Sequence, residues 1–145
     1  MIGIKKILCP IDYSECSLEA LKYATHFALR DSGKLYLMHV IDIRSLEQYA
    51  PFQVAIKPES EMITQIREDL WAKVPEEVRK KVEMEAIVTV GIPLVEILLA
   101  AKEKGVDMIV MGTHGRTGLA HVIMGSVAEN VVRRAPCPVL TVRRT

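Results

Sequence analysis

The glycine-rich segment from Gly112 to Ser126 contains the residues whose types and spacing best suit the binding of phosphate groups. Glycine has no Cβ and tolerates positive φ, so backbone N–H groups at Gly112, Gly115 and Gly125 can approach a phosphate closely. Gly125 and Ser126 stand where a helix is expected to begin, and the free N–H groups of a helix N-terminus favour an anion. The Ser126 hydroxyl and the Arg116 side chain add further donors. The segment therefore predicts an anion site, with a nucleotide as the expected occupant.

The spacing of this segment differs from three better-known motifs. No Lys follows Gly125, so the G-x-x-x-x-G-K-[ST] pattern of P-loop proteins is absent. No G-x-G-x-x-G follows the first expected strand, and no G-x-S-x-G hydrolase motif occurs. Glycine also punctuates ordinary loops, so by spacing alone a glycine-rich turn followed by a capped helix stays open as an alternative.

The elements that position this segment can be read from the apolar pattern of the chain. Strands are expected where short apolar or alternating runs occur, over residues 4–11, 35–41, 82–90, 106–111 and 139–142. Helices are expected where apolar residues recur at helical spacing, over residues 12–33, 59–72, briefly after 75, 93–105 and 126–134. Asp12 and Ser14 compete as N-cap of the first helix. Residues 42–57 lack a clean period and are expected to form a long surface loop.

Two of these patterns also predict which side chains are buried. The apolar stripe of the first helix comprises Leu18, Leu21, Tyr23, Ala24, Ala28 and Leu29. In the third strand, Glu83, Glu85 and Thr89 alternate with an apolar set, which predicts an edge or half-exposed strand. That apolar set, expected to face one way, is Val82, Met84, Ala86, Val88 and Val90.

Strands that alternate with helices favour an α/β fold with a parallel sheet and right-handed crossovers. We expect an open five-stranded parallel sheet with helices on both faces, Rossmann-like, with the strand order 3-2-1-4-5. Ligands of such folds bind beyond the carboxyl ends of the strands, where the winding direction reverses. That crevice lies between the loops after the first and fourth strands, which are Pro10-Ile11-Asp12 and the segment from Gly112 onward.

Composition bounds the class of protein. The 145 residues suit a single domain over residues 1–145, and 50% hydrophobic residues with 5% aromatics suit helices packed on an aliphatic sheet. A formal net charge of +1 argues against a nucleic-acid-coating protein, which would carry a basic excess. The N-terminus lacks a signal-peptide pattern, and no apolar run reaches the roughly 20 residues that span a bilayer. We therefore expect a cytoplasmic protein without nucleic-acid or membrane partners.

The cysteines and histidines carry weaker signals. Cys9, Cys16 and Cys137 form an odd, sparse set that suits a reduced compartment. Buried, unreactive thiols are expected, with a Cys9–Cys16 disulfide as the alternative. His114 and His121 lie seven residues apart and lack the spacing of a protein metal site, so none is expected.

Five stretches of the sequence together form a more specific pattern, namely ILCPIDYS at 7–14, LMHVID at 37–42, MIVMGTHG at 108–115, GSVAE at 125–129 and PCPVL at 136–140. Gly112, Gly115, Gly125 and Ser126 fit the motif G-x2-G-x9-G-[ST] at every spacing. In this combination the chain resembles the universal stress protein family, in its ATP-binding subgroup, over nearly its whole length. Residues 42–81 match least well, and nothing is carried over there.

The resemblance implies ATP held between the two loops, in a fold of the adenine-nucleotide alpha-hydrolase type. Its phosphates would be held by Gly112, Gly115, Gly125 and Ser126, with Arg116 and Val127 nearby. A Mg²⁺ or Mn²⁺ ion could bridge those phosphates, because Mg²⁺ often uses substrate oxygens and water with few protein ligands.

The resemblance also implies contacts to the rest of the nucleotide. Asp12, in the Pro10-Ile11-Asp12 loop, would lie at the ribose or adenine end. A carboxylate there is satisfied by ribose hydroxyls, whereas beside a triphosphate it would repel the ligand. Val40 resembles the position that contacts adenine, and Met111 would line the pocket. The alternative roles stay open: an N-cap for Asp12, and plain core for Val40 and Met111.

The last strand, Val139 to Val142, predicts a partner. If it lies at the sheet edge, it exposes unpaired backbone that a second copy could pair with across a two-fold axis. The resemblance implies such a homodimer, and the alternative is a covered edge in a monomer.

Three functions follow from these patterns. The leading one is an ATP-binding regulatory protein of the stress response, acting on an unidentified regulatory partner. The first alternative is a slow ATPase or an adenylyl-transferring enzyme. We assign no catalytic residue, because the crevice offers phosphate donors but no obvious general base for a water molecule. His114 is the only loop residue that could be nominated as a base. The second alternative is a nucleotide-free dimeric interaction module, against which the intact glycine motif speaks. A phospho-acceptor receiver is excluded, because the third strand ends in Thr89-Val90-Gly91 without an acceptor Asp.

Overall fold

Five parallel strands form one sheet in the order β3-β2-β1-β4-β5. The computed structural model describes residues 2–47, 60–114 and 124–144. Its strands are β1 (Lys6–Pro10), β2 (Lys34–Asp42), β3 (Glu83–Gly91), β4 (Met108–Gly112) and β5 (Val139–Val142). Every neighbouring pair is parallel, with registers such as Leu8 opposite Tyr36 and Ile109 opposite Val139. The predicted fold class and strand order are confirmed.

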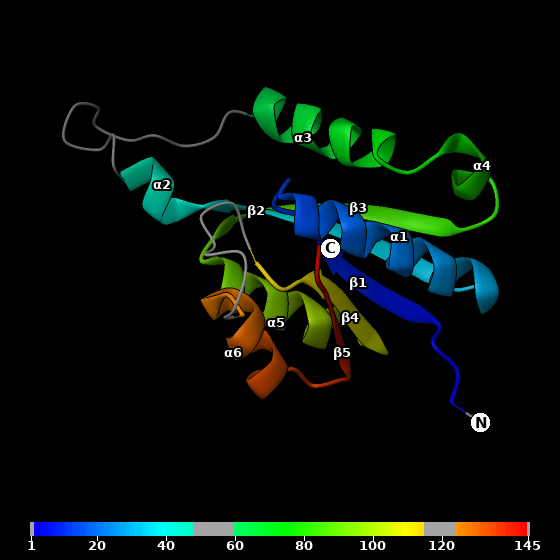
Figure 1. Ribbon diagram of the computed structural model, residues 1–145. Coiled ribbons are helices and arrows are strands. Elements are labelled where there is room, and N and C mark those ends of the chain that lie inside the picture. Colours follow the sequence, from blue (N-terminus) through cyan, green and yellow to red (C-terminus); the bar gives the residue numbers. More distant parts are fainter. Residues whose placement is uncertain (1, 48–59, 115–123, 145) are drawn as a thin grey trace.

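Helices cover both faces of the sheet (Figure 1). They are α1 (Glu15–Arg30), α2 (Ile43–Glu47), α3 (Ser60–Ala72), α4 (Glu76–Arg79), α5 (Pro93–Lys104) and α6 (Ser126–Arg134). Apolar residues of α1 and α3 pack with one face of the sheet, and those of α5 and α6 pack with the other. This is the layered arrangement that alternating strands and helices produce in a parallel sheet.

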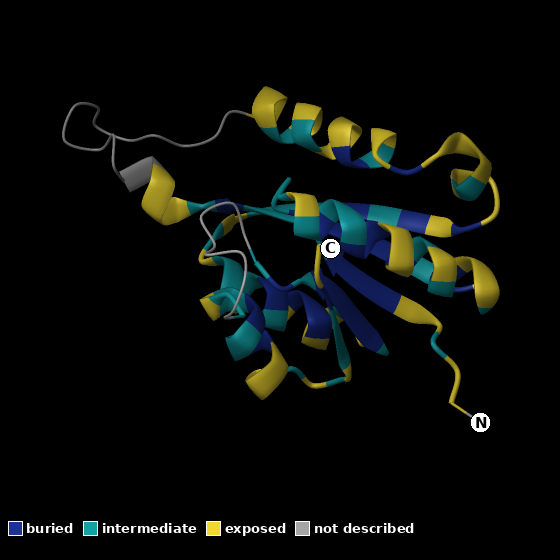
Figure 2. Cartoon of the chain, viewed as in Figure 1, coloured by how far each residue is buried: buried dark blue, intermediate teal, exposed yellow. Residues whose placement is uncertain are grey.

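The core consists of two apolar layers, one on each side of the sheet. Successive side chains of a strand point to opposite faces, so Leu35 and Leu37 lie in the layer under α1 and α3 while Tyr36 and Met38 lie under α5 and α6. The central strands are buried on both faces, as in other parallel sheets, and Figure 2 shows the exposed residues gathered on the outward sides of the helices. Cys9, in the middle of β1, has no exposed surface.

The expected surface loop over residues 42–57 is wrong at its beginning, where α2 forms over Ile43–Glu47. Asp42 supplies the reason. Its Oδ1 accepts the backbone N–H of Arg44 at 2.9 Å, and its carboxylate pairs with the Arg44 guanidinium at 2.7 Å. The hydrogen bond from Arg44 lowers the pKa of the Asp42 carboxyl. Such a local cap starts a helix too short to show a hydrophobic period. Residues 48–57 lie outside the described part of the chain.

The first strand begins at Lys6 rather than Ile4. Here the backbone N–H groups of Lys5 and Lys6 donate to Asp107 Oδ2, at 2.9 and 2.8 Å. A carboxylate that comes from a position about 100 residues away therefore holds the entry to β1, and a local apolar pattern cannot reveal it.

Three side chains expected to be buried are exposed. Tyr23 and Leu29 of α1 are 47% and 40% exposed, and Val90 near the end of β3 is 36% exposed. The layer on this face takes Ala20, Leu21, Ala24 and Ala28 from α1. These four residues form the stripe of α1 that faces the sheet, and Tyr23 and Leu29 lie outside this stripe.

The three cysteines are free thiols, with Cys9 buried and Cys16 and Cys137 half-buried. The alternative Cys9–Cys16 disulfide is therefore not formed. Burial raises the pKa of the Cys9 thiol. Among the described helices, none is both long and apolar enough to cross a membrane.

Candidate functional site

Two loops meet at the carboxyl edge of the sheet, one after β1 and one after β4. The Ser14 hydroxyl donates to the backbone carbonyl of His114 at 3.3 Å, although the two residues are 100 positions apart. Because β1 and β4 are neighbours in the sheet, their carboxyl ends bring these loops together. The sequence predicted a crevice at this place, and the described residues put its two sides in contact.

The loop after β1 is held by a short chain of hydrogen bonds. Asp12 Oδ1 accepts the backbone N–H of Ser14 at 2.9 Å, and Ser14 Oγ accepts the backbone N–H of Ser17 at 3.2 Å. Ser14 is thus the N-cap of α1. Of the two candidates for that role, the structure selects Ser14, and Asp12 instead forms the turn that precedes the helix. Asp12 is half-buried, in the loop that follows β1 at the carboxyl edge of the sheet.

Tyr13 in the same loop has an unusual backbone conformation. Its φ is 65°, a region that aromatic residues rarely occupy. Its ring contacts the ring of His39, with centroids 5.0 Å apart, and the Lys73 ammonium lies 5.6 Å from its centroid. The His39 Nδ1 atom is also hydrogen-bonded to the backbone carbonyl of Ile11 at 2.7 Å. Sequence reasoning missed both residues, although a histidine within an apolar strand is a visible signal.

The segment after β4 has its two ends tied together. Thr113 continues the pairing with β5, because its backbone N–H donates to the Val142 carbonyl at 3.0 Å. Its own carbonyl accepts the backbone N–H of Gly125 at 2.7 Å. The start of α6 therefore lies directly beside the end of β4. Gly115 and Arg116, which the sequence assigned to phosphate binding, lie outside the described residues.

Gly112 has a packing role that is independent of any ligand. A Cβ atom placed on it would lie 2.7 Å from both the carbonyl carbon and the Cβ of Cys16, and 2.8 Å from the backbone nitrogen of Ser17. The first turn of α1 therefore rests directly on the end of β4. This close approach brings the loop after β1 to the glycine-rich segment.

The N-terminus of α6 differs from that of α1. Its N-cap, Gly125, is extended (φ −60°, ψ 154°) and provides no side-chain hydrogen bond, whereas Ser14 caps α1 with its hydroxyl. Ser126 is exposed at the first helical position. The acid in this first turn, Glu129, is paired with Arg133 at 2.9 Å. An anion beside Gly125 would thus meet backbone donors and a neutralised carboxylate.

The apolar candidates share one face of the sheet. Val40, Met111 and Val127 all pack in the layer under α5 and α6, together with Met124. Met111 is 5% exposed, whereas Val40 and Val127 are half-buried. The structure therefore places these three candidates on the same face of the sheet, in the layer that α5 and α6 cover.

Pro10 and Ile11 behave differently from these three. Pro10 is half-buried at the end of β1, and Ile11 is 2% exposed in the layer under α1 and α3. The backbone N–H of Ile11 donates to the Met38 carbonyl at 2.7 Å, and its carbonyl is bonded to His39. These contacts make Ile11 part of the frame that holds Asp12.

His114 is also fixed in place. Its Nδ1 atom is hydrogen-bonded to Thr113 Oγ1 at 2.9 Å, and Thr113 is 5% exposed. In residues 2–47, 60–114 and 124–144, no group of three or more His, Cys, Asp or Glu side chains is arranged to hold a metal ion.

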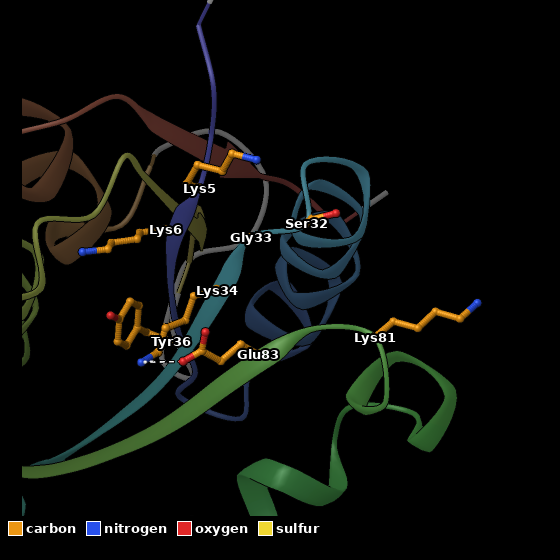
Figure 3. Close-up of a pocket in the computed structure, with 8 residues that line it drawn as sticks. All are labelled: Lys5, Lys6, Ser32, Gly33, Lys34, Tyr36, Lys81 and Glu83. Atoms are coloured by element: carbon orange, nitrogen blue, oxygen red, sulfur yellow. Dashed lines mark ion pairs between the residues drawn. The ribbon is translucent and has the colours of Figure 1, made fainter.

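A hollow lined by lysines lies at the opposite, amino edge of the sheet (Figure 3). Lys34 pairs there with Glu83 at 3.3 Å, and this hydrogen bond raises the pKa of Lys34. Lys5 donates to the Asp31 carbonyl at 2.6 Å. Figure 3 shows the amino groups of Lys5, Lys6 and Lys81 pointing in different directions. The hollow therefore lacks the converging donors that a ligand requires.

Comparison with known proteins gives a consistent result. The sequence model of the universal stress protein family matches residues 3–143. Universal stress protein MJ0577 of Methanocaldococcus jannaschii is 35% identical over 154 residues, covering 97% of this chain and 95% of the relative. A solved structure of MJ0577 superposes with a TM-score of 0.76 at 36% identity and covers 99% of both chains.

Two more distant structures share the fold and hold nucleotides. The universal stress protein from Archaeoglobus fulgidus in complex with dAMP has a TM-score of 0.66 at 24% identity, over 99% of this chain and 100% of its own. A universal stress protein in complex with cAMP has a TM-score of 0.69 at 24% identity, over 98% of both chains.

Proposed function

The chain belongs to the universal stress protein family, and we propose that it is an ATP-binding regulatory protein of the stress response. The nucleotide lies in the crevice between the loops after β1 and β4. One observation carries the proposal: the hydrogen bond from Gly125 N–H to the Thr113 carbonyl sets the start of α6, which has no side-chain cap, at the carboxyl edge of the sheet. The complexes of two relatives with dAMP and cAMP support an adenine nucleotide as the ligand.

The phosphates occupy the start of α6 in this proposal. Ser126 and Val127 provide backbone N–H groups in the first turn, where the helix dipole favours negative charge. The N–H of Gly125 is bonded to the Thr113 carbonyl, so Gly125 contributes by its missing Cβ, which lets a phosphate come close to the helix start. Gly112 and Gly115 extend this cradle, and Arg116 supplies a cation. A Mg²⁺ or Mn²⁺ ion that accompanies the nucleotide would add positive charge beside the phosphates and would need few protein ligands. Titration of ATP in the presence of EDTA should then give a weaker affinity than titration with Mg²⁺, and equal affinities would remove the metal from the proposal.

The adenosine end lies across the crevice. Val40 and Met111 form an apolar wall for the base, because they share the layer that also contains Val127. Asp12 accepts hydrogen bonds from the ribose hydroxyls and stays away from the phosphates. Pro10 and Ile11 complete this side by fixing the backbone on which Asp12 stands.

The identity of the nucleotide is tested with the purified protein. The protein is denatured, and any released nucleotide is identified by chromatography and quantified against protein. The empty protein is then titrated with ATP, ADP and AMP by calorimetry. Stoichiometric ATP without turnover supports a regulatory protein. ADP together with measurable hydrolysis would support the slow enzyme instead, and the absence of any binding would leave the nucleotide-free interaction module.

The motif itself is tested with a matched pair of glycine variants. Gly115→Val alters a motif position, and Gly118→Val alters a glycine of the same segment that the motif does not include. We expect the first variant to lose ATP binding and the second to retain it, both with an unchanged circular dichroism spectrum. Equal ATP affinities in the two variants would overturn the assignment of the segment.

A second copy of the chain is the partner that we propose for β5. This strand lies at the edge of the sheet and carries no charged side chain, whereas the opposite edge strand, β3, carries Glu83 and Glu85. Charged residues protect an edge strand from pairing, so β5 is the edge that is open to a neighbour. The resulting two-fold dimer acts in the cytoplasm, where the three thiols stay reduced.

A further inference from the structure

We propose that His39 is a positioning residue for the nucleotide site, which holds Asp12 in place for the ribose and thereby favours ribonucleotides over 2′-deoxyribonucleotides. The inference rests on the proposed ATP site. It concerns a residue that lies on the other face of the sheet from Val40 and Met111, and therefore acts through the loop after β1.

The first contact of His39 fixes the residue before Asp12. Its Nδ1 atom lies 2.7 Å from the carbonyl oxygen of Ile11. A carbonyl can only accept, so the imidazole carries its proton on Nδ1 and donates it. The backbone N–H of Ile11 donates at the same time to the Met38 carbonyl at 2.7 Å. Two consecutive residues of β2 therefore hold both polar backbone atoms of Ile11.

The second contact fixes the residue after Asp12. Tyr13 has a φ of 65°, and a bulky residue keeps this conformation only where its surroundings enforce it. The His39 ring contacts the Tyr13 ring at a centroid distance of 5.0 Å and an interplanar angle of 56°. Lys73, just beyond α3, places its ammonium 5.6 Å from the same ring. The Tyr13 ring is thereby held between β2 and the end of α3.

These two contacts hold the residues immediately before and after Asp12. Asp12 stands between Ile11 and Tyr13, and its Oδ1 already accepts the Ser14 N–H at 2.9 Å. The direction of its side chain depends on the backbone of these neighbours, and a binding group is effective only when its supporting residues hold it to within about 0.5 Å. One imidazole thus controls the geometry with which Asp12 meets the ribose.

Selection of the sugar follows from this geometry. A carboxylate that accepts from both ribose hydroxyls loses one hydrogen bond with a 2′-deoxyribose. We therefore expect ATP to bind about 5- to 30-fold more tightly than 2′-deoxy-ATP, the ratio that one hydrogen bond to a charged oxygen provides. If Asp12 is displaced, this ratio falls towards one, while contacts to the phosphates at the start of α6 are unaffected.

The test compares three ligands in three variants. His39→Leu removes the donor and the aromatic ring, His39→Asn restores a donor near the position of Nδ1, and His26→Leu is a control at an exposed histidine of α1. ATP, 2′-deoxy-ATP and tripolyphosphate are titrated by calorimetry. We expect His39→Leu to lower the ratio of ATP to 2′-deoxy-ATP affinity towards one without changing tripolyphosphate affinity. His39→Asn should recover part of the ratio, and His26→Leu should keep the wild-type ratio.

A double substitution separates positioning from general stability. If His39 acts through Asp12, His39→Leu has no further effect on the affinity ratio once Asp12→Ala is present. Additive losses would overturn the proposal, as would a wild-type ratio in His39→Leu or a parallel loss of tripolyphosphate binding. Should His39→Leu fail to fold, Tyr13→Gly removes the ring but accommodates the positive φ, and the same loss of ratio is expected. A wild-type protein that binds no ATP contradicts the proposed function itself, and the inference then falls with it.

Discussion

Two separate requirements favour glycine at position 112. Gly112 belongs to the glycine motif, and it also lies under the first turn of α1. A Cβ atom there would lie 2.7 Å from the carbonyl carbon of Cys16, which is backbone and cannot rotate away. Gly112→Ala should therefore lower the free energy of unfolding by roughly 1–3 kcal/mol, as overpacked core substitutions do. Urea denaturation without nucleotide measures this. Gly3→Ala is the control, since nothing lies within 4 Å of its added Cβ. Equal stabilities would refute the close packing.

Ser126 contributes to the proposed site through its hydroxyl. Ser126→Ala should weaken ATP binding by roughly 1–2 kcal/mol, or about 5- to 30-fold, because one hydrogen bond to a charged oxygen is lost. Calorimetric titration measures the change, with thermal unfolding of the empty protein as a check on stability. An unchanged dissociation constant would show that Ser126 serves the helix alone.

Single residues also mark the limit of prediction from sequence. The pattern around Asp12 and Ser14 indicated a helix start, but it did not decide which residue is the cap. The choice depends on the Ser14–His114 contact and on the turn at Asp12, which involve three-dimensional geometry. His39 was visible as a polar residue in an apolar strand. Its contact with Tyr13 was not visible, because no local rule predicts a positive φ for tyrosine.

At the scale of secondary structure, α1 is the element that connects the two loops of the site. Its N-cap Ser14 accepts from Ser17 N–H at 3.2 Å and donates to the His114 carbonyl. Ser14→Ala should therefore cost about 1 kcal/mol of stability, the usual effect of removing a cap. Thr25→Ala is the matched control within the same helix, because Thr25 bonds only the preceding turn, at the Lys22 carbonyl. Chemical denaturation of both variants checks the expectation, and a larger loss in Thr25→Ala would contradict it.

Element boundaries follow the sequence where the signal is local. Pro93 opens α5 and Gly105, with a φ of 60°, closes it, as the proline and glycine predicted. The start of β1 and the presence of α2 were not predicted. The first depends on Asp107, which is distant in sequence, and the second on the single carboxylate of Asp42. Long amphipathic or alternating segments can be predicted from the sequence, whereas a boundary set by a single side chain such as Asp107 or Asp42 cannot.

At the scale of the whole molecule, the open edge at β5 leads to a prediction about assembly. The carbonyl of Pro138 accepts from Ile109 of β4, and that of Val142 accepts from Thr113 just after β4, at 3.0 Å each. Backbone groups alternate in direction along a parallel strand, so those of Val139 and Thr141 face outward. Thr141→Pro should remove one outward N–H, leave the pairing with β4 intact and convert the dimer to a monomer. Light scattering coupled to size exclusion measures the mass.

Thr141→Val retains this N–H group and serves as the control for the assembly experiment. It should remain a dimer at the concentration where Thr141→Pro is monomeric. A wild-type protein that elutes as a monomer, or a dimer that survives the proline, would show that the edge at β5 is not the interface.

The strand order could be predicted from the sequence, because alternating strands and helices allow few arrangements. The position of the crevice then follows from that order. The Ser14–His114 contact agrees with that placement of the loops. The proposed pairing of β5 with a second chain could not be judged from the strand order in the same way, because it depends on a surface formed by two chains.

The thiol of Cys9 lies at the centre of the sheet, with no exposed surface and with its pKa raised by burial. A thiol reagent needs both access and the thiolate, so it modifies Cys9 only while β1 is detached from β2 and β4. In a protein whose Cys16 and Cys137 are replaced by serine, the labelling rate becomes a gauge of how often the sheet opens. A ligand that binds only the closed molecule slows this rate by a factor of 1 + [L]/Kd. The labelling rate of Cys9, in the central strand β1, thus reports whether a ligand is bound in the crevice.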